Sequence, residues 1–278
     1  MFNILYAGNG GAFDGILISS MSLARATKKP LNIIILTMDF SQENEAFTPI
    51  TEKQRLFIDS VCKESNPLSK VSVIDVSELY RRNLINSPNA KSKYTPYALL
   101  RLLAHMVPSM PDKVLYLDTD TLAVKDIEEL YSLQIDDYEL AGARDFYGRI
   151  FFSHDYINSG VLLLNIKKIK ETGLFDRVIA RLNEKRLFLP DQSAINELAT
   201  KKLIIDDKYN EQKHFNRDDT VIQHFAKTIL WLPVFHTRNI KPWNTEMVKS
   251  TLTHKYDDLL DLYEEKKKQF ESEAANEN

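Results

Sequence analysis

The sequence contains one cysteine among its 278 residues, Cys62. An intramolecular disulfide is therefore impossible, and a zinc site built on several thiolates is excluded. Cys62 follows Phe57, Ile58 and Val61 at helical spacing in "TEKQRLFIDSVCKES", so we interpret it as a core thiol that carries no chemistry. Such sparing use of cysteine indicates a reducing compartment.

The chain also lacks an excess of positive charge and any long apolar run. With 36 basic and 39 acidic residues the formal net charge is −3, whereas binding to nucleic-acid phosphates needs clustered positive charge, so we expect no nucleic-acid partner. The stretches "GVLLLNI" and "ILWLPVF" are far shorter than the roughly 20 residues of a membrane span. The opening "NILYA" resembles a first strand and not a signal peptide. We expect a cytoplasmic protein, with peripheral contact to the inner face of the membrane as the alternative.

Apolar runs of strand length alternate with helical patterns through the first two thirds of the chain. We predict strands at residues 3–7, 31–37, 71–76, 113–118, 138–143 and 159–166, and helices from about residue 13, from about residue 51 and over 97–107. Because these runs are continuously apolar, they predict a mostly parallel sheet covered by helices on both faces, an α/β fold. With no internal repeat or Gly/Ser linker, we predict a single catalytic domain over 1–245 and a charged helical extension over 246–278.

Three features lie where predicted strands end, which is where ligands gather in open α/β sheets. They are the glycine-containing loop "YAGNGGAF" at 6–13, the pair Asp118 and Asp120 in "KVLYLDTDTLAV", and the strand-like "TVIQHFA" with His224. The loop matches neither glycine-rich phosphate fingerprint. The carboxylate pair is therefore the feature that most strongly indicates chemistry.

Two chemistries use an Asp-x-Asp pair of this kind. "DTDTL" resembles the opening motif of haloacid-dehalogenase-type phosphatases, in which Asp118 would attack phosphorus and Asp120 would act as acid and base, with Asp206 and Asp207 as the later acidic pair. That motif normally lies on the first strand, whereas here about 110 residues of α/β pattern precede it. Alternatively, both carboxylates bind a divalent cation that bridges the diphosphate of a sugar nucleotide. The pair alone does not separate these hypotheses.

Further segments over residues 3–245 resemble glycosyltransferase family 8, the retaining sugar-nucleotide enzymes that include bacterial lipooligosaccharide galactosyltransferases and glycogenin. They are "YALLRLLAHMVPSMPDKVLYLDTD", "LAGARDF", "YINSGVLLLNIKKI", "LPDQSAINEL" and "NIKPW". Asn158 alone could cap a turn and Asp191 alone could cap a helix. The joint order of the segments is what carries the resemblance, which implies a GT-A-type, Rossmann-like fold.

The resemblance also implies roles for individual residues. Donor-binding positions are Ala7, Asn9, Arg101, Asp118, Thr119, Asp120, Asp145 and Lys241, and positions at the reacting carbon are Asn158, Asp191 and Gln192. Trp243 completes the Lys-Pro-Trp signature, whose lysine would bind the diphosphate. The first loop reads Ala7-Gly8-Asn9 where the family usually has an acidic residue and an aromatic that hold the uridine.

The family's metal site needs a histidine besides Asp118 and Asp120, and two candidates exist. His224 lies 17 residues before Lys241, and His236 lies five before it, against about six in the family. We prefer His224 because it ends the right kind of strand, which makes "KTILWLPVF" an insertion.

The expected function is a Mn²⁺- or Mg²⁺-dependent retaining transferase. It would move glucose or galactose from a UDP-hexose to a hydroxyl of a saccharide or glycolipid acceptor in bacterial glycan assembly, and could act as a homo-oligomer. A sugar-nucleotide-binding protein without turnover is the further alternative, because of the altered first loop.

Overall fold

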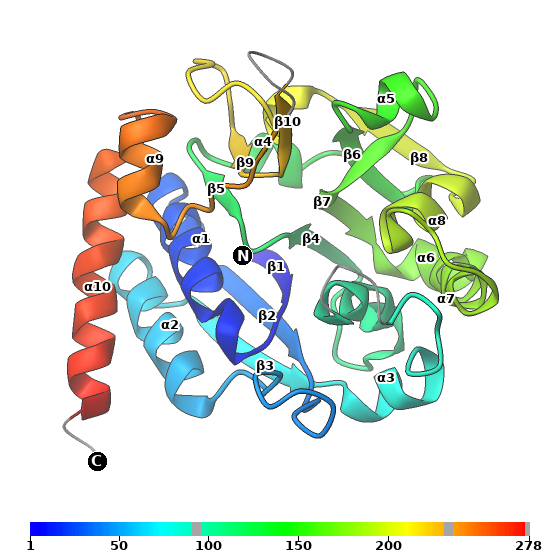
Figure 1. The fold of residues 1–278 in the computed structure, drawn as a ribbon, viewed down its shortest axis with the longest axis horizontal. Coiled ribbons are helices and arrows are strands. Elements are labelled where there is room, and N and C mark those ends of the chain that lie inside the picture. The colour runs from blue at the N-terminus through cyan, green and yellow to red at the C-terminus, as the bar shows by residue number, and fades with distance from the viewer. Residues whose placement is uncertain (91–95, 231–235, 276–278) are drawn as a thin grey trace.

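The structure is a computed structural model that describes residues 1–90, 96–230 and 236–275, apart from the side chains of residues 229, 230, 236 and 274. A central sheet lies between two layers of helices (Figure 1). Its strand order is β3-β2-β1-β4-β7-β6-β8, and β7 alone runs against the other six. The prediction of a mostly parallel, mixed α/β sheet is confirmed.

Six of the seven strands of this sheet lie close to the predicted positions, and the seventh, β8, was not predicted. The seven are β1 (Phe2–Ala7), β2 (Leu31–Thr37), β3 (Lys70–Asp75), β4 (Lys113–Leu117), β6 (Leu140–Arg144), β7 (Ile157–Asn165) and β8 (Lys202–Ile205). Two smaller sheets pair β5 (Thr121–Ala123) with β9 (Ile222–His224) and β10 (Thr228–Leu230) with β11 (His236–Arg238).

The α-helices cover the sheet or follow its strands. They are α1 (Phe13–Ala26), α2 (Glu52–Ser65), α3 (Ser77–Asn83), α4 (Glu128–Tyr131), α5 (Gly148–Phe151), α6 (Ile166–Thr172), α7 (Leu174–Glu184), α8 (Pro190–Leu198), α9 (Thr245–Thr251) and α10 (Asp257–Ala275). The 3₁₀ helices are η1 (Gly10–Ala12), η2 (Pro96–Met106) and η3 (Asp207–Tyr209). The helix predicted over 97–107 is therefore present as a 3₁₀ helix.

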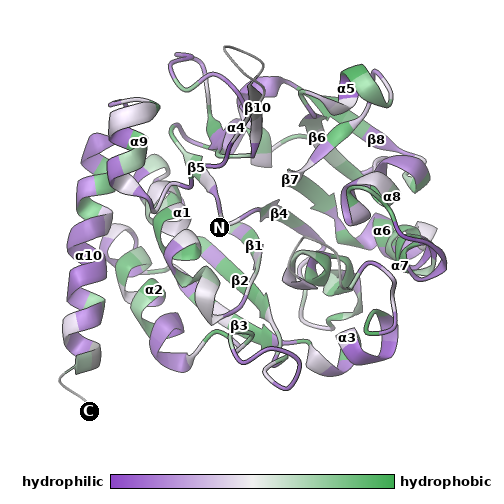
Figure 2. Cartoon of the chain, viewed as in Figure 1, coloured by the Kyte–Doolittle hydropathy of each residue, from purple (hydrophilic) through white to green (hydrophobic). Residues whose placement is uncertain are grey.

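Each face of the sheet has its own hydrophobic core, because neighbouring residues of a strand point to opposite sides. Ile4 and Leu115 belong to the core that α1, α2 and α10 cover, whereas Leu5 and Val114 belong to the core covered by η2 and α6 to α8. Hydrophobic residues accordingly concentrate on the central strands in Figure 2. The continuous apolar runs in the sequence result from this burial on both faces.

The strand order places a switch point between β1 and β4. The chain proceeds from β1 outward to β2 and β3 on one side, and β4 then pairs with β1 on the other side, parallel to it. In open sheets, ligands bind outside the carboxyl ends of strands at such a point. Asp118 follows β4 and Gly8 follows β1, so the Asp-x-Asp turn lies at this position.

The C-terminal helix α10 packs lengthwise on α1 and α2 (Figure 1). The centre of the Phe270 ring lies 4.4 Å from the centre of the Phe13 ring and 5.1 Å from the centre of the Phe57 ring. Lys267 pairs with Asp14 at 3.0 Å. The boundary between 245 and 246 stays a prediction, but α10 shares the core of the sheet's α1 face. None of the helices in the described ranges has the length and hydropathy that a membrane crossing requires.

Truncation of Phe270 tests whether α10 stabilises this core. We expect Phe270→Ala to lower the free energy of unfolding by about 2 kcal/mol, because its partly buried ring packs against two others. Leu68→Ala is the control, since Leu68 is 72% exposed, and it should change stability by less than about 0.5 kcal/mol. Urea denaturation measures both, and equal stabilities would show that α10 packs without stabilising the fold.

Candidate active site

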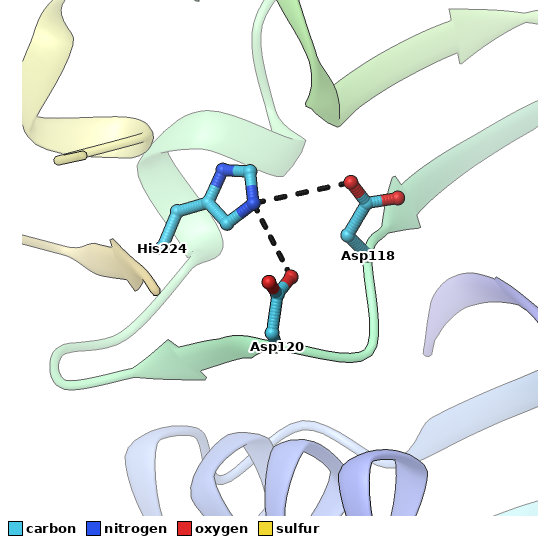
Figure 3. Close-up of side chains that lie close together, drawn as sticks. All are labelled: Asp118, Asp120 and His224. Atoms are coloured by element: carbon cyan, nitrogen blue, oxygen red, sulfur yellow. Dashed lines mark ion pairs between the residues drawn. The ribbon is translucent and has the colours of Figure 1, made fainter. Parts of the chain in front are cut away.

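Asp118, Asp120 and His224 come together at the switch point (Figure 3). The Nε2 atom of His224 lies 3.2 Å from Asp120 Oδ1 and 3.9 Å from Asp118 Oδ2. One ligand atom from each residue lies within 4.8 Å of the other two, which is close enough for one cation to contact all three. His224 is 4% exposed, while the Asp118 side chain is 29% exposed.

The pairing of β5 with β9 brings His224 to the aspartates from about one hundred residues away. Thr121 lies opposite His224 in this antiparallel pair, and the Phe225 N–H donates to the Asp120 carbonyl at 2.9 Å. Register in such a pair fixes which residue lies beside which. His224 therefore occupies its place through strand pairing and not through local sequence.

A glycine provides the space for the histidine ring. A Cβ on Gly160 of β7 would lie 2.2 Å from His224 Cε1 and 2.8 Å from Asp118 Oδ2. Contacts under 3.0 Å force a displacement, so any larger residue at 160 would move the ring or the carboxylate.

Arg101 of η2 neutralises Asp118. Its Nη2 donates to Asp118 Oδ1 at 3.0 Å, its Nη1 donates to the Ser159 carbonyl, and its guanidinium lies 4.1 Å from the centre of the Tyr116 ring. Tyr116 also donates its hydroxyl to Asp118 Oδ1 at 2.7 Å. Burial disfavours the charge on Arg101, but Tyr116 and the two carboxylates of Asp118 and Asp191 outweigh it and raise the arginine pKa.

Lys241 and His224 together neutralise Asp120. Lys241 Nζ donates to Asp120 Oδ2 and, at 3.0 Å, to the Phe225 carbonyl. Burial favours the neutral acid, but His224 and Lys241 more than offset it and hold the Asp120 pKa below its usual range. Burial likewise lowers the pKa of His224, and Asp120 outweighs this and raises it. Asp120 is thus kept ionised.

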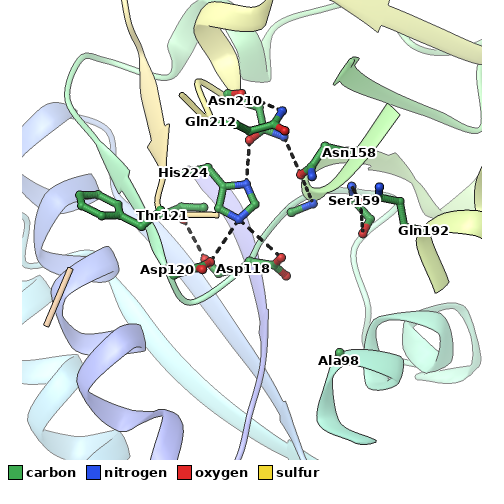
Figure 4. A network of polar contacts seen from close by, with 12 residues as sticks. Ala98, Asp118, Asp120, Thr121, Asn158, Ser159, Gln192, Asn210, Gln212 and His224 are labelled. Atoms are coloured by element: carbon green, nitrogen blue, oxygen red, sulfur yellow. Dashed lines mark hydrogen bonds and ion pairs between the residues drawn. The ribbon is translucent and has the colours of Figure 1, made fainter. Parts of the chain in front are cut away.

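Asn158 and Gln192 lie beside the first group (Figure 4), and hydrogen bonds join both to Asp145. Asn158 Nδ2 donates to Asp145 Oδ2 at 2.8 Å, and Gln192 Nε2 donates to the same oxygen at 3.3 Å. Gln192 Oε1 accepts the Ser159 N–H at 3.1 Å. Asp145 follows β6, Asn158 lies in β7 and Gln192 lies in α8, so three elements supply this second group.

Asp191, the residue before Gln192, lies against Arg101. Its Oδ2 is 3.2 Å from Arg101 Nε, but that N–H donates to the Ala98 carbonyl, and Oδ2 has no hydrogen bond within the described part of the chain. Burial raises the Asp191 pKa, against the opposing effect of Arg101. Arg101 therefore lies between two carboxylates, Asp118 and Asp191.

Three predicted donor-binding residues lie at the edge of this arrangement. Ala7 ends β1, Asn9 donates to the Ala46 carbonyl, and Thr119 lies in the turn between the aspartates. A Cβ on Gly15 of α1 would lie 2.8 Å from both the Thr119 carbonyl and Trp243 Cζ3, so that glycine lets α1 approach the turn. Among the described residues, no hydrogen bond or ion pair joins Ala7, Asn9 or Thr119 to the Asp118 cluster. The side chain of the rival His236 lies outside the described residues.

The sequence interpretation missed Tyr116, Gly160 and Asn210. Asn210 is 1% exposed, and its Nδ2 donates to Asn158 Oδ1 at 3.0 Å while its Oδ1 lies 2.9 Å from His224 Nδ1. Tyr116 could have been noticed, because a tyrosine two residues before Asp118 on the same strand points to the same face. Gly160 and Asn210 act through contacts between distant segments, which no local pattern signals.

The donor atoms fit a hard divalent cation. Two carboxylates and one imidazole nitrogen are ligands that Mn²⁺ accepts, and Mg²⁺ prefers oxygen ligands alone. Asp118, Asp120 and Asp191 outnumber Arg101 and Lys241 by one negative charge, which a cation would offset. The Asp-Asp-His cluster at the switch point could therefore hold a divalent cation.

The chain belongs to the family described as Glycosyl transferase family 8, whose profile matches residues 3–247. A putative glycosyltransferase of Haemophilus influenzae is 26% identical over 221 residues, which cover 75% of this chain and 62% of that protein. The lipopolysaccharide glucosyltransferase WaaO of Escherichia coli is 28% identical over 239 residues, 71% of this chain and 69% of WaaO. Glycosyltransferase GlyA of Streptococcus pneumoniae is 38% identical over 102 residues, and the match covers 36% of this chain and only 15% of GlyA.

Solved structures of glycosyltransferases share the fold. The galactosyltransferase LgtC, in complex with donor and acceptor sugar analogs, superposes with a TM-score of 0.67 at 17% identity, over 93% of this chain and 100% of LgtC. Glycosyltransferase GlyE of Streptococcus pneumoniae has a TM-score of 0.59 at 23% identity, over 88% of this chain and 57% of GlyE. The fold is therefore of the GT-A type, and the chain is a family 8 glycosyltransferase related to lipopolysaccharide glycosyltransferases.

Substitution of Gly160 tests whether the space beside His224 is needed to bind a cation. We expect Gly160→Ala to weaken Mn²⁺ binding by about 100-fold, because the added methyl group displaces His224 or Asp118. Gly11→Ala is the control, since its Cβ would lie 3.6 Å or more from the nearest atoms and should not change Mn²⁺ affinity. Calorimetric titration measures both affinities, and an unchanged affinity in Gly160→Ala would show that the ring needs no such space.

Proposed function

We propose that this chain transfers a hexose, glucose or galactose, from a UDP-sugar to an acceptor hydroxyl with retention of anomeric configuration. The observation that carries the proposal is the Asp118, Asp120 and His224 cluster at the switch point of a GT-A fold in a family 8 chain. WaaO is named a glucosyltransferase and LgtC a galactosyltransferase, which supports a hexose donor and leaves both sugars open.

Asp118, Asp120 and His224 would hold Mn²⁺, with Mg²⁺ as the second choice because of the imidazole ligand. When bound, the cation would offset the negative charge of the diphosphate and of the departing nucleotide. The protein's own contribution is to pair both carboxylates with cations. Arg101 pairs with Asp118 and Lys241 with Asp120, and Lys241 would turn to a phosphate of the bound donor.

The remaining residues of the site would bind the donor and orient it. Asp145 and Asn158 are placed to accept and donate hydrogen bonds to sugar hydroxyls. Ala7 and Asn9, after β1, and Thr119, between the aspartates, would lie along the nucleotide. The proposed catalytic unit is residues 1–245, with 246–278 as an extension that packs behind it.

Retention requires either a covalent intermediate or attack on the face that the leaving group occupies. A glutamine amide is a poor nucleophile, so we favour attack on the same face. The bond from C1 to the diphosphate oxygen breaks, the bond to the acceptor oxygen forms, and the acceptor proton passes to the departing phosphate. Gln192 would stabilise the positive charge at C1, and Asp191 would orient the sugar, aided by its unpartnered Oδ2.

Apolar side chains on α5 support a saccharide or glycolipid acceptor. Ile150, Phe151 and Phe152 are 65%, 63% and 55% exposed, and the Phe152 ring stacks on Tyr156 at 4.8 Å. The Tyr156 hydroxyl lies 3.1 Å from the hydroxyl of Ser193, next to Gln192. Contacts thus connect Phe152 through Tyr156 with Ser193, the residue next to Gln192.

The phosphatase hypothesis has no support. The chain's family and fold are those of glycosyltransferases. Asp206 and Asp207 would have supplied its later acidic pair, but Asp206 caps η3 and pairs with Arg217, and Asp207 pairs with Arg149. Among the described residues, neither has a hydrogen bond or ion pair with Asp118. A binding protein without turnover differs from the proposed enzyme only in the outcome of an activity assay.

A thermal-shift panel of UDP-hexoses with Mn²⁺ tests the donor and the metal together. At a ligand concentration about 100 times Kd, we expect the wild-type Tm to rise by roughly 5 °C, because the ligand binds only the folded state. Asp120→Ala should lose this rise. If no UDP-hexose stabilises the wild type with any metal, the proposed donor class is wrong.

Replacement of Gln192 tests its role at the reacting carbon. We expect Gln192→Ala to lower kcat for UDP release by about 100-fold with little change in KM for the donor, because the lost interaction forms mainly in the transition state. Glu197→Gln is the control, since Glu197 is on the same helix but pairs with Arg181 at the surface. A change in KM alone would assign Gln192 to binding. Donor binding without any UDP release by the wild type would instead support the binding-protein alternative.

A further inference from the structure

Three hydrogen bonds in series connect Asp145 with His224. Figure 4 shows the part of this series from Asn158 through Asn210 to His224. Asn158 Nδ2 donates to Asp145 Oδ2 at 2.8 Å, and Asn210 Nδ2 donates to Asn158 Oδ1 at 3.0 Å. Asn210 Oδ1 lies 2.9 Å from His224 Nδ1. We call Asp145, Asn158, Asn210 and His224 the relay.

The donors and acceptors of the hydrogen bonds in the relay can be assigned in only one way. Asp145 accepts four N–H groups, from the Tyr147 and Gly148 backbone and from the side chains of Asn158 and Gln192, so it acts purely as an acceptor. Asn158 must therefore turn its NH₂ to Asp145 and its oxygen to Asn210. The Gly160 N–H donates to the same Asn158 oxygen at 2.9 Å and fixes this orientation independently.

The direction determines which ring nitrogen of His224 carries a proton. Asn210 must turn its NH₂ toward the Asn158 oxygen, so only its own oxygen remains for His224. Nδ1 must then be the protonated nitrogen. Nε2, which lies 3.2 Å from Asp120, is then the nitrogen that faces the two aspartates and whose lone pair a bound cation would take.

Because Asn158, Asn210 and His224 are buried, bulk water does not offer them alternative hydrogen-bond partners. Asn210 is 1% exposed, Asn158 7% and His224 4%. A buried donor that loses its acceptor keeps the full cost of desolvation. The relay is therefore a fixed arrangement and not one of several that exchange.

We propose that Asn210 is a positioning residue of the metal site, which holds His224 in the tautomer and ring orientation that present Nε2 to the cation. Asp145, at the other end of the relay, sets the direction of every bond in it. The inference rests on the proposed divalent cation. It assigns to Asn210 a function that neither strand pairing nor the Asp-x-Asp motif provides.

Mn²⁺ alone, titrated into the full chain and followed by electron paramagnetic resonance of the free ion, tests the proposal. We expect Asn210→Ala to weaken Mn²⁺ binding by 10- to 100-fold, the range typical for loss of a partner behind a ligating histidine. Asn210→Asp keeps an acceptor for Nδ1, and Asn158 keeps the Gly160 N–H, so its Mn²⁺ affinity should stay within about threefold of wild type.

Asn89→Ala is the matched control for the loss of a buried asparagine. Asn89 is also 1% exposed and bonds to the Leu182 and Lys185 carbonyls at the end of α7. The Asn89→Ala variant should have a lower Tm than the wild type and an unchanged Mn²⁺ affinity. Equal Mn²⁺ affinity in wild type and Asn210→Ala, or equal losses in Asn210→Ala and Asn210→Asp, would overturn the relay and leave the proposed function intact. No Mn²⁺ binding by the wild type would overturn both.

A spectroscopic measurement on the wild type identifies the protonated ring nitrogen of His224 directly. In the Mg²⁺-loaded wild type, long-range ¹H–¹⁵N correlation spectra should show His224 with a protonated Nδ1 and a bare Nε2, because the Asn210 oxygen can only accept. His224→Gln assigns the signals. Protonation at Nε2 would contradict the direction of the relay.

Discussion

Repulsion between two neighbouring carboxylates is the constraint on which the site depends. Asp118 and Asp120 lie at the end of β4 with carboxylate oxygens within 4.8 Å of each other, and like charges so close in a partly buried place repel each other. Arg101 pairs with the first, and Lys241 pairs with the second. These cations come from η2 and the loop before α9, so widely separated parts of the chain must fold together before both carboxylates are paired.

The fold was largely readable from the sequence, because strands buried on both faces leave continuous apolar runs. The run at 31–37 matches β2 residue for residue, since both flanks change to turn and helix signals there. The choice between His224 and His236 was harder. Distance along the chain favoured His236, and only the pairing register of β5 with β9 places His224 beside Asp120.

Gly160 and Asn210 could not have been predicted for a related reason. Gly160 matters because a Cβ there would meet a ring from another segment, and Asn210 because its two ends meet partners 52 and 14 residues away. Neither requirement leaves a periodic pattern or a charge pattern. Sequence reasoning identifies groups that do chemistry by their type, but it finds the groups that hold them only when the tertiary contacts are known.

Hydrogen bonds join Asp145 to Asn158, which leads to His224 of the proposed metal site, and to Gln192 at the proposed reacting carbon. A carboxylate offers about four lone-pair positions, and Asp145 already accepts from Tyr147 at 3.1 Å, Gly148 at 2.6 Å, Asn158 at 2.8 Å and Gln192 at 3.3 Å. A sugar hydroxyl that donates to Asp145 must therefore replace one of these donors. The Gln192 bond is the longest, and its loss leaves the relay to His224 unchanged. The amide that a bound sugar would release most easily is thus the one proposed to act at C1.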